Sequence, residues 1–277
     1  MLYKHYSLLP EDILSNFLKN PNLRYSCAKD LNDPLEGIVN LQIQNGPDHS
    51  SEVLNELISQ IKNTTYVCSL NNSPLEPLMW SHYASSHTGF MVEYDLSSLK
   101  KIIQVKYQNT PKITELTNPL LLTILSTDAS NEMQSPIIID FVEQVISSLC
   151  SKSHHWHYEN EKRMIRNSEE FINYIQEPNS YVTKYNKGEC KNMNCANEIC
   201  SDSDCPNDVV YFHEKIEQST VKSIVFGVKT PQEYIEKAKS IIKAYDLQIN
   251  TYKAEFIQNS YELNVPGHPT LDMFKKS

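Results

Sequence analysis

Residues 78–96 have the sequence LMWSHYASSHTGFMVEYDL, and they predict a helix and a strand on either side of one glycine. The spacing of 78–87 is helical, and Gly89 then leads into 90–96, where side chains alternate as in a strand. Outward from here, the same criteria predict strands at 2–6, 23–27, 65–70, 101–107, 162–167, 180–185, 209–213, 221–227 and 248–256, and helices at 11–18, 51–62, 136–150, 168–175 and 231–245. Because helices and strands are intermixed without regular alternation, we expect an α+β fold and not a doubly wound one.

The chain shows neither an internal repeat nor a linker long enough to separate two domains. We therefore expect a single α+β domain over 1–277. Two stretches depart from the regular pattern: a mostly helical insertion at about 108–150 and a cysteine-rich loop at 188–207.

Composition excludes several kinds of protein. Of the 277 residues, 40% are hydrophobic and 21% charged, which is typical of a packed globular chain. Only six glycines occur, and none lies close enough to another for a G-x-G-x-x-G turn or a G-x-x-x-x-G-K phosphate loop. Any nucleotide must therefore bind through some other architecture.

The net charge of −9 disfavours nucleic acid and anionic membranes as partners, because binding to phosphates depends on Lys and Arg. No run of about 18 apolar residues is present, so we expect no membrane span. The first residues, MLYKHYSLLPED, lack the apolar core of a secretory signal, and we expect synthesis in a cytoplasm.

The strongest local motif is WHYENEKR at 156–163, which runs into the strand expected at 162–167. Residues two apart on a strand point to the same side, so we expect Glu159 and Glu161 to face one cleft together, with Arg163 further along the same strand face. Carboxylates this close repel, which can raise the pKa of one of them. Such a pair suits acid–base catalysis, metal binding or stabilisation of a cationic transition state. The alternative is an exposed edge strand whose charges are solvated.

A second motif is MWSHYA at 79–84. Its Trp80, His82 and Tyr83 can offer stacking faces and polar edges to a planar ligand, or they can belong to a core helix. A third, NDPLE at 32–36, contains Asp33 and Glu36, and Asp33 alone can serve to close a turn.

Four cysteines stand at intervals of five residues in CKNMNCANEICSDSDC: Cys190, Cys195, Cys200 and Cys205. They can bind a structural zinc ion, although the usual pairs are C-x-x-C. Disulfides in an oxidising compartment and free thiols are the other two possibilities. His213 can join a metal site. In each case we expect a structural role.

The motifs gain meaning from their order along the chain. A Leu-Tyr-Lys start, N-D-P-x-E, a strand with Val-Cys, M-W-S-H-Y-A-x-x-H-x-G, W-x-x-E-x-E-x-R and a late I-x-F-G occur in this series. That series resembles the bacterial family of unknown function DUF2971, from Leu2 to about Phe256. The resemblance names no reaction.

The order of elements also resembles that of mono-ADP-ribosyltransferases. The resemblance implies a split β-sheet core with flanking helices and NAD as substrate. It implies that Glu161 is the catalytic glutamate and that Glu159 orients the acceptor. It further implies which residues bind the cofactor. The first strand would contribute Tyr3, Lys4, His5 and Tyr6, and the middle strand Ser69. Residues of the two motifs would lie nearby: Trp80, His82, Tyr83 and Arg163. Two departures are that Lys4 and His5 stand in place of an arginine, and that only Ser69 represents a Ser-Thr-Ser pattern.

The first functional hypothesis is therefore an NAD-dependent ADP-ribosyltransferase that modifies a target protein, with arginine the favoured acceptor. As a bacterial effector or toxin it would enter a host cell by a route that needs no signal peptide. The second hypothesis is a metal-dependent nuclease or phosphoesterase, whose ligands would be acidic residues and one histidine: Asp33, Glu36, Glu159, Glu161 and His82. The third is a non-enzymatic interaction module.

Overall fold

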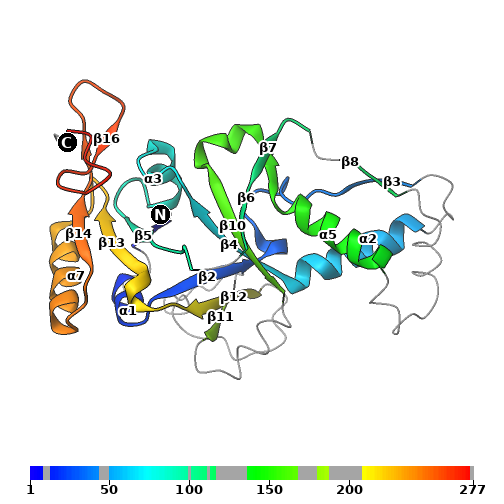
Figure 1. Ribbon diagram of the computed structural model, residues 1–277, viewed down its shortest axis with the longest axis horizontal. Helices are drawn as coiled ribbons and strands as arrows, with labels where there is room; N and C mark the ends of the chain where they lie inside the picture. The colour runs from blue at the N-terminus through cyan, green and yellow to red at the C-terminus, as the bar shows by residue number, and fades with distance from the viewer. Residues whose placement is uncertain are drawn as a thin grey trace.

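The computed structural model of the protein describes residues 1–8, 13–43, 50–98, 101–110, 113–116, 136–167, 180–186 and 208–274 (Figure 1). The helix expected at 168–175 and the four clustered cysteines, Cys190, Cys195, Cys200 and Cys205, lie outside these residues. Helices and strands are intermixed, as expected. The helices are α1 (Ile13–Lys19), α2 (Ser50–Thr64), α3 (Pro77–Tyr83), α5 (Pro136–Ser148) and α7 (Gln232–Ala244), with 3₁₀ turns η1 (Ala28–Asp30), η2 (His154–Glu159) and η4 (Gln218–Thr220).

One large mixed sheet organises the described part of the chain. Its strands are β1 (Leu2–Tyr6), β2 (Asn22–Cys27), β4 (Thr65–Asn71), β5 (Phe90–Tyr94), β6 (Ile102–Gln104), β10 (Glu161–Asn167), β11 (Ser180–Asn186), β12 (Asp208–Lys215), β13 (Val221–Phe226) and β14 (Asn250–Lys253). The order is β11-β12-β2-β4-β1-β5-β13-β14, and β10 pairs with both β4 and β6. Every pair in it is antiparallel except β13 with β14.

Three small pairs complete the strands. They are β3 (Asn40–Ile43) with β8 (Ile113–Leu116), β7 (Lys106–Gln108) with β9 (Ser151–Ser153), and β15 (Glu255–Phe256) with β16 (Leu263–Asn264). The single strand expected at 101–107 is thus two strands, β6 and β7. They are separated at the buried Val105, whose amide donates to the carbonyl of Glu161.

The sheet divides along strand β4. One edge of β4 pairs with β10 along its whole length. On the other edge, Tyr66 and Val67 pair with β2, and Asn71 pairs with β1. Among the described strands none pairs with 68–70 on that edge, so the halves β11-β12-β2 and β1-β5-β13-β14 meet only through β4. The ammonium of Lys4 fills this gap and donates to the carbonyl of Ser69 at 2.9 Å.

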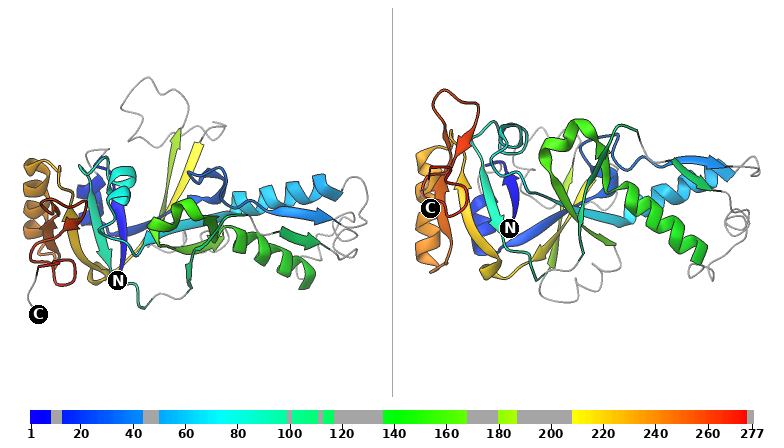
Figure 2. Two further views of the ribbon diagram at one scale, coloured as in Figure 1. Left: turned by 90° about the horizontal axis from the view of Figure 1, so that it is seen from above. Right: turned by 45° about the horizontal axis from the view of Figure 1, so that its top comes forward.

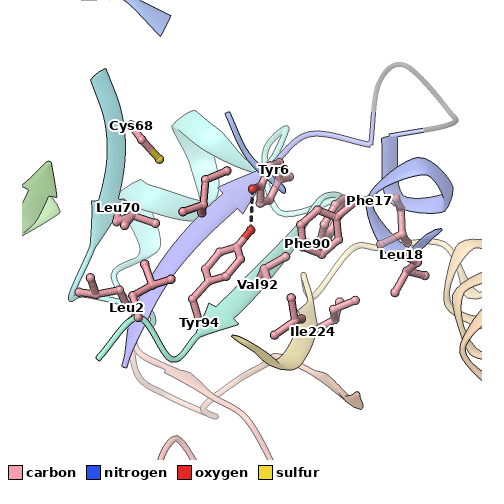
Figure 3. Close-up of a cluster of buried hydrophobic side chains, with 14 of the residues drawn as sticks. Leu2, Tyr6, Phe17, Leu18, Cys68, Leu70, Phe90, Val92, Tyr94 and Ile224 are labelled. Carbon is pink, nitrogen blue, oxygen red and sulfur yellow. Dashed lines mark hydrogen bonds between the residues drawn. The ribbon is translucent and has the colours of Figure 1, made fainter. Parts of the chain in front are cut away.

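The main hydrophobic core lies between the sheet and helices α1 and α7. Figure 3 shows Tyr6, Phe90 and Tyr94 together with Phe17 and Leu18 of α1, and the hydroxyls of Tyr6 and Tyr94 are 2.7 Å apart. Ile235 and Ala238 of α7 belong to the same cluster. Strands of both halves of the sheet and the two helices α1 and α7 thereby enclose one apolar core.

A second apolar cluster contains Tyr3 and Trp80, which pack with Met91, Val225 and residues near the C-terminus. Because side chains alternate along β1, Tyr3 joins this cluster whereas Leu2 and Tyr6 join the main core.

Gly89 and Gly227, the glycines of the M-W-S-H-Y-A-x-x-H-x-G and I-x-F-G motifs, contact each other through their backbones. A Cβ on Gly89 would lie 2.1 Å from the carbonyl oxygen of Tyr6, and the amide of Gly227 donates to the carbonyl of Gly89 at 2.9 Å. Close backbone contact therefore accounts for both positions.

The molecule is elongated. Helix α7 lies at one end, and α2, α5, β3 and β8 lie at the other (Figures 1 and 2). The described part of the expected insertion at 108–150 forms β8 and α5, so it contains a strand as well as a helix. No helix in the described part of the chain has the length and apolar character needed to cross a bilayer.

Candidate active site

A cavity of about 230 Å³ opens beside the division in the sheet. Strands β1, β2, β4, β10 and β12 contribute to its wall, as do the 30–36 segment, α3, β9 and η2. Residues from widely separated parts of the sequence therefore meet here, and several of them are charged and buried.

Three carboxylates converge on one ammonium group in the wall of the cavity. The Nζ atom of Lys152 lies 2.7 Å from Glu159, 2.8 Å from Glu36 and 3.4 Å from Glu161. All four side chains are buried. Buried charges of this kind are tolerated only when they are paired, so Lys152 holds the three acids together.

The second cation of this cluster is Arg163, which is 1% exposed. Its Nε and Nη2 atoms contact the two carboxylate oxygens of Glu161 at 2.7 and 2.9 Å, and Nη2 also lies 2.6 Å from Glu36. Nη1 donates to the carbonyl of Leu149. The fork-like contact fixes the orientation of Glu161 as well as its charge.

The charged cluster, defined as Glu36, Lys152, Glu159, Glu161 and Arg163, has three acids and two cations, which leaves one net negative charge when all are ionised. Burial alone would raise the pKa of Glu161, but the Arg163 and Lys152 charges outweigh it and hold that pKa below its ordinary value. For Glu159, burial outweighs the attraction of Lys152, and the pKa is raised. The two glutamates therefore differ in their affinity for a proton.

The two glutamates converge by a route different from the one that strand geometry predicts. Glu159 ends the 3₁₀ turn η2, Asn160 adopts a left-handed conformation with φ of 44°, and β10 begins only at Glu161. The expectation that both lie on one strand face was therefore wrong. The amide of Glu161 donates to the hydroxyl of Tyr107 at 2.7 Å, which anchors the start of β10.

Aromatic side chains stand beside the carboxylates. Tyr83 lines the cavity, and its hydroxyl donates to Glu159 at 2.6 Å. Burial and the neighbouring Glu159 raise the pKa of Tyr83, so the phenol stays protonated. Trp156 also lines the cavity, with the Lys152 ammonium 4.8 Å from its ring centre. A planar ligand would thus find an aromatic wall next to a negative charge.

Lys4 and His5 of β1 and Ser69 and Asn71 of β4 form another part of the wall. Nδ1 of His5 lies 3.2 Å from the side-chain nitrogen of Asn71. Burial lowers the pKa of His5 to about 3, so this ring is neutral near pH 7. Burial also lowers the pKa of Lys4.

Most of the site residues expected from sequence line the cavity, and a minority do not. Those that line it are Lys4, His5, Ser69, Tyr83, Glu159, Glu161 and Arg163. Tyr3 and Trp80 pack in the second apolar cluster and Tyr6 in the main core, so they support the wall from behind. His82 is exposed and lies outside the cavity wall, with its ring 6.4 Å from that of Trp156.

The set of acids considered as metal ligands is arranged around protein cations. Glu36, Glu159 and Glu161 meet at the ammonium of Lys152, which takes the place of a central cation. Asp33 lines the cavity and also closes a turn, because its side chain accepts from the amide of Leu35 at 2.9 Å. Among the residues that the structure describes, no group of three or more His, Cys, Asp or Glu side chains is arranged to hold a metal ion.

Sequence reasoning missed Lys152 as a site residue. It stands in the polar stretch SKSHH, where a lysine is ordinarily a solvated surface residue. Its role as the partner of three carboxylates becomes visible only in the fold, where Glu36 and residues 159–163 lie next to Lys152. Trp156 is the first residue of the WHYENEKR motif, but the sequence pattern does not show whether its ring lines a cavity or packs in the core.

A separate buried network links Glu93, Ser223 and His268 outside the cavity wall. Nδ1 of His268 accepts from the amide of Leu271, and its Nε2 faces both Glu93 at 3.2 Å and Ser223 at 3.3 Å. A Ser-His-acid relay needs the acid and the serine on opposite ring nitrogens, so this network does not form one. It fastens the C-terminal segment to β5 and β13.

Comparison with known proteins gives one match. No curated protein and no solved structure is similar to this chain. Residues 79–164 match the family model described as "Protein of unknown function (DUF2971)", and this segment contains Tyr83, Lys152, Glu159, Glu161 and Arg163. The part of the chain that supplies most of the charged cluster is thus similar to DUF2971, a family of unknown function.

Proposed function

We propose that this protein cleaves the nicotinamide glycosidic bond of NAD and transfers ADP-ribose to a protein side chain, with arginine the favoured acceptor. One observation carries the proposal: two buried glutamates, whose pKa values are shifted in opposite directions, stand beside an aromatic wall in a cavity.

The arrangement of strands supports the same proposal. Resemblance to mono-ADP-ribosyltransferases implies a polar or basic residue on the first strand, a serine on a middle strand and E-x-E on a later one. Here Lys4 on β1, Ser69 on β4 and Glu161 on β10 lie on strands that are direct neighbours, and all three residues line one cavity.

Glu161 would act on the sugar. When the bond from C1′ of the ribose to the nicotinamide nitrogen breaks, its electron pair leaves with nicotinamide, and positive charge develops on the ribose. An ionised carboxylate near C1′ stabilises this oxocarbenium-like state more than the ground state. The low pKa of Glu161 keeps it ionised, and Arg163 holds it in one orientation.

Glu159 would act on the acceptor. A guanidinium nitrogen of the target arginine forms the new bond to C1′ and releases a proton, which the Glu159 carboxylate takes up. Its raised pKa suits a group that must accept a proton. Because Lys152 already contacts one oxygen of Glu159, the incoming guanidinium competes with Lys152 for that position.

The size of the cavity limits what it holds. Its volume of about 230 Å³ is below the range of roughly 300–1,000 Å³ that is usual for small-molecule pockets. It therefore takes only part of a dinucleotide, and the adenosine end extends beyond the mouth. Tyr83 and Trp156 offer the faces against which the nicotinamide ring can stack.

The test uses NAD labelled in its adenylate part, lysate proteins as acceptors, and mass spectrometry of the products. Glu161→Gln keeps the size of the side chain, and we expect it to lower transfer by about 10²–10³-fold. The matched control is Glu236→Gln on the exposed surface of α7, which should transfer as the wild type does. Thermal melting of each variant shows whether it is folded.

Wild-type transfer from folded Glu161→Gln would refute the assignment of Glu161. Release of nicotinamide without label on any protein would replace the transferase with an NAD hydrolase. Neither nicotinamide nor label from the wild type would refute the proposed reaction.

A further inference from the structure

The cavity has a second charged region, on strands β1 and β2. Along β2, Leu23 and Tyr25 point into the main core, so the alternate residues Arg24 and Ser26 face the cavity. The Arg24 guanidinium lies 4.7 Å from the ring centre of Tyr211 on the neighbouring strand β12. Stacking on tyrosine fixes the plane of the guanidinium and leaves its N–H groups to other partners.

Neither cation of this region has an acidic partner. Among the described residues, no carboxylate lies within 4.0 Å of the Arg24 or Lys4 head groups, although Asp30 and Asp33 line the same cavity. The Nε atom of Arg24 is buried without a hydrogen-bond partner. Lys4 donates to the carbonyl of Ser69 and approaches the sulfur of Cys68 at 3.9 Å.

The contrast with the charged cluster is informative. There, both Lys152 and Arg163 contact carboxylates within 3.4 Å. Here, the charges of Lys4 and Arg24 act on each other and on His213. Burial lowers the pKa of Lys4, and Arg24 lowers it further, which outweighs the opposite effects of Cys68 and Glu161. Burial together with the Arg24 and Lys4 charges lowers the pKa of His213 to about 3, so its ring is neutral near pH 7 and adds no charge to this region.

We propose that Lys4 and Arg24 form an anion-binding subsite that takes the phosphate groups of a nucleotide substrate. A guanidinium and an ammonium without acidic partners at one cavity wall attract and orient a multiply charged anion, and Arg does so through paired N–H groups. The identification of that nucleotide as NAD rests on the proposed function, whereas binding of the anion itself does not. It would bind the pyrophosphate while Glu161 meets the nicotinamide ribose.

The test measures binding first and turnover second. Isothermal titration with inorganic pyrophosphate and with ADP-ribose is carried out on the wild type, Arg24→Gln and Arg24→Lys. Lys222→Gln, which removes one positive charge from β13 far along the sheet, controls for net charge. We expect Arg24→Gln to weaken binding of both probes by about 10- to 100-fold, the usual effect of removing a charged hydrogen bond. Arg24→Lys should recover part of that loss, and Lys222→Gln should bind as the wild type does.

Turnover separates this proposal from the previous one. If NAD is the substrate, Arg24→Gln should raise the KM for NAD with little change in kcat, because the contact is made equally in the ground and transition states. Arg24-dependent binding of pyrophosphate without any cleavage of NAD would support the subsite and refute NAD as the substrate. Cleavage with the same KM in Arg24→Gln, or no binding of either probe by the wild type, would overturn the subsite. Melting curves establish that each variant is folded.

Discussion

Replacement of Lys152 by Met tests the central electrostatic argument, because this ammonium holds three buried carboxylates. Its contacts to Glu159, Glu36 and Glu161 measure 2.7, 2.8 and 3.4 Å, and its side chain is 6% exposed. Breaking a buried ion pair from one side costs about 3–5 kcal/mol. That is a large part of the roughly 5–15 kcal/mol by which a folded domain is stable. We therefore expect the Lys152→Met variant to unfold at a much lower urea concentration.

A second substitution should restore part of that loss. Lys152→Met leaves the charged cluster with two net negative charges, and adding Glu159→Gln returns it to one. Neighbouring residues in such a network couple by about 0.5–3 kcal/mol, so the double variant should be more stable than Lys152→Met alone. Lys106→Met is the matched control, since Lys106 is exposed on the adjacent strand β7 and its loss should change stability by about 0.5 kcal/mol or less.

The pH dependence has a definite sign. Burial already raises the pKa of Glu159, and Lys152 opposes that rise, so without the Lys152 ammonium the folded state retains a proton on Glu159 that the unfolded chain releases. Stability of the variant then falls as the pH rises, so its deficit should be larger at about pH 8 than at about pH 5. Urea unfolding followed by circular dichroism measures both values. An unchanged midpoint, or a deficit independent of pH, would refute the role given to Lys152.

Three further predictions follow from single contacts. Gly89→Ala places a Cβ 2.1 Å from the carbonyl oxygen of Tyr6, and we expect a loss of about 1–3 kcal/mol; an unaltered melting temperature would contradict this. Asn160→Val forces a β-branched residue into a left-handed conformation and should lower the free energy of urea unfolding by about 1–2 kcal/mol. Asn160→Gly should be nearly neutral, because glycine adopts this conformation freely. Equal effects of the two substitutions would show that backbone conformation is not the cause. Tyr83→Phe removes a hydrogen bond that lowers the pKa of Glu159. Under the proposed function, the acidic limb of the pH profile of transfer should therefore move to higher pH, and an unmoved limb would show that Glu159 is not the base.

Local periodicity predicted several elements of the fold. The strand expected at 2–6 is β1, and the helix expected at 231–245 is α7 within a residue at either end. Both have regular patterns whose apolar side chains enter the main core. Where the burial of one face determines the spacing of apolar residues, the type of element can be predicted from the sequence.

The charged cluster was only partly predictable. Glu159, Glu161 and Arg163 stand close together in the sequence and were expected to meet. Lys152 is seven residues from Glu159, and Glu36 is more than a hundred away, and they join the others only because the 30–36 segment, β9 and η2 pack against β10. The contacts of Lys152 and Glu36 with the other members of the cluster are tertiary, so no local sequence pattern predicts them.

The aromatic motif shows a second limit. Helical spacing places Trp80 and Tyr83 on one side of α3, and sequence reasoning treated them alike. In the fold, the Trp80 ring is fully buried against Tyr3, while the hydroxyl of Tyr83 reaches Glu159. Side-chain length and the position of a neighbouring segment decide the difference, and neither is visible in the spacing.

The turn between the two glutamates has a consequence for evolution and for engineering. Glu161 belongs to a strand in the middle of a network of pairings, whereas Glu159 ends a short turn that begins at His154. The two carboxylates thus come from different elements of the fold, and the Lys152 ammonium joins them. Under the proposed function, a change in the 154–159 turn would alter the group that meets the acceptor while Glu161 keeps its place on β10.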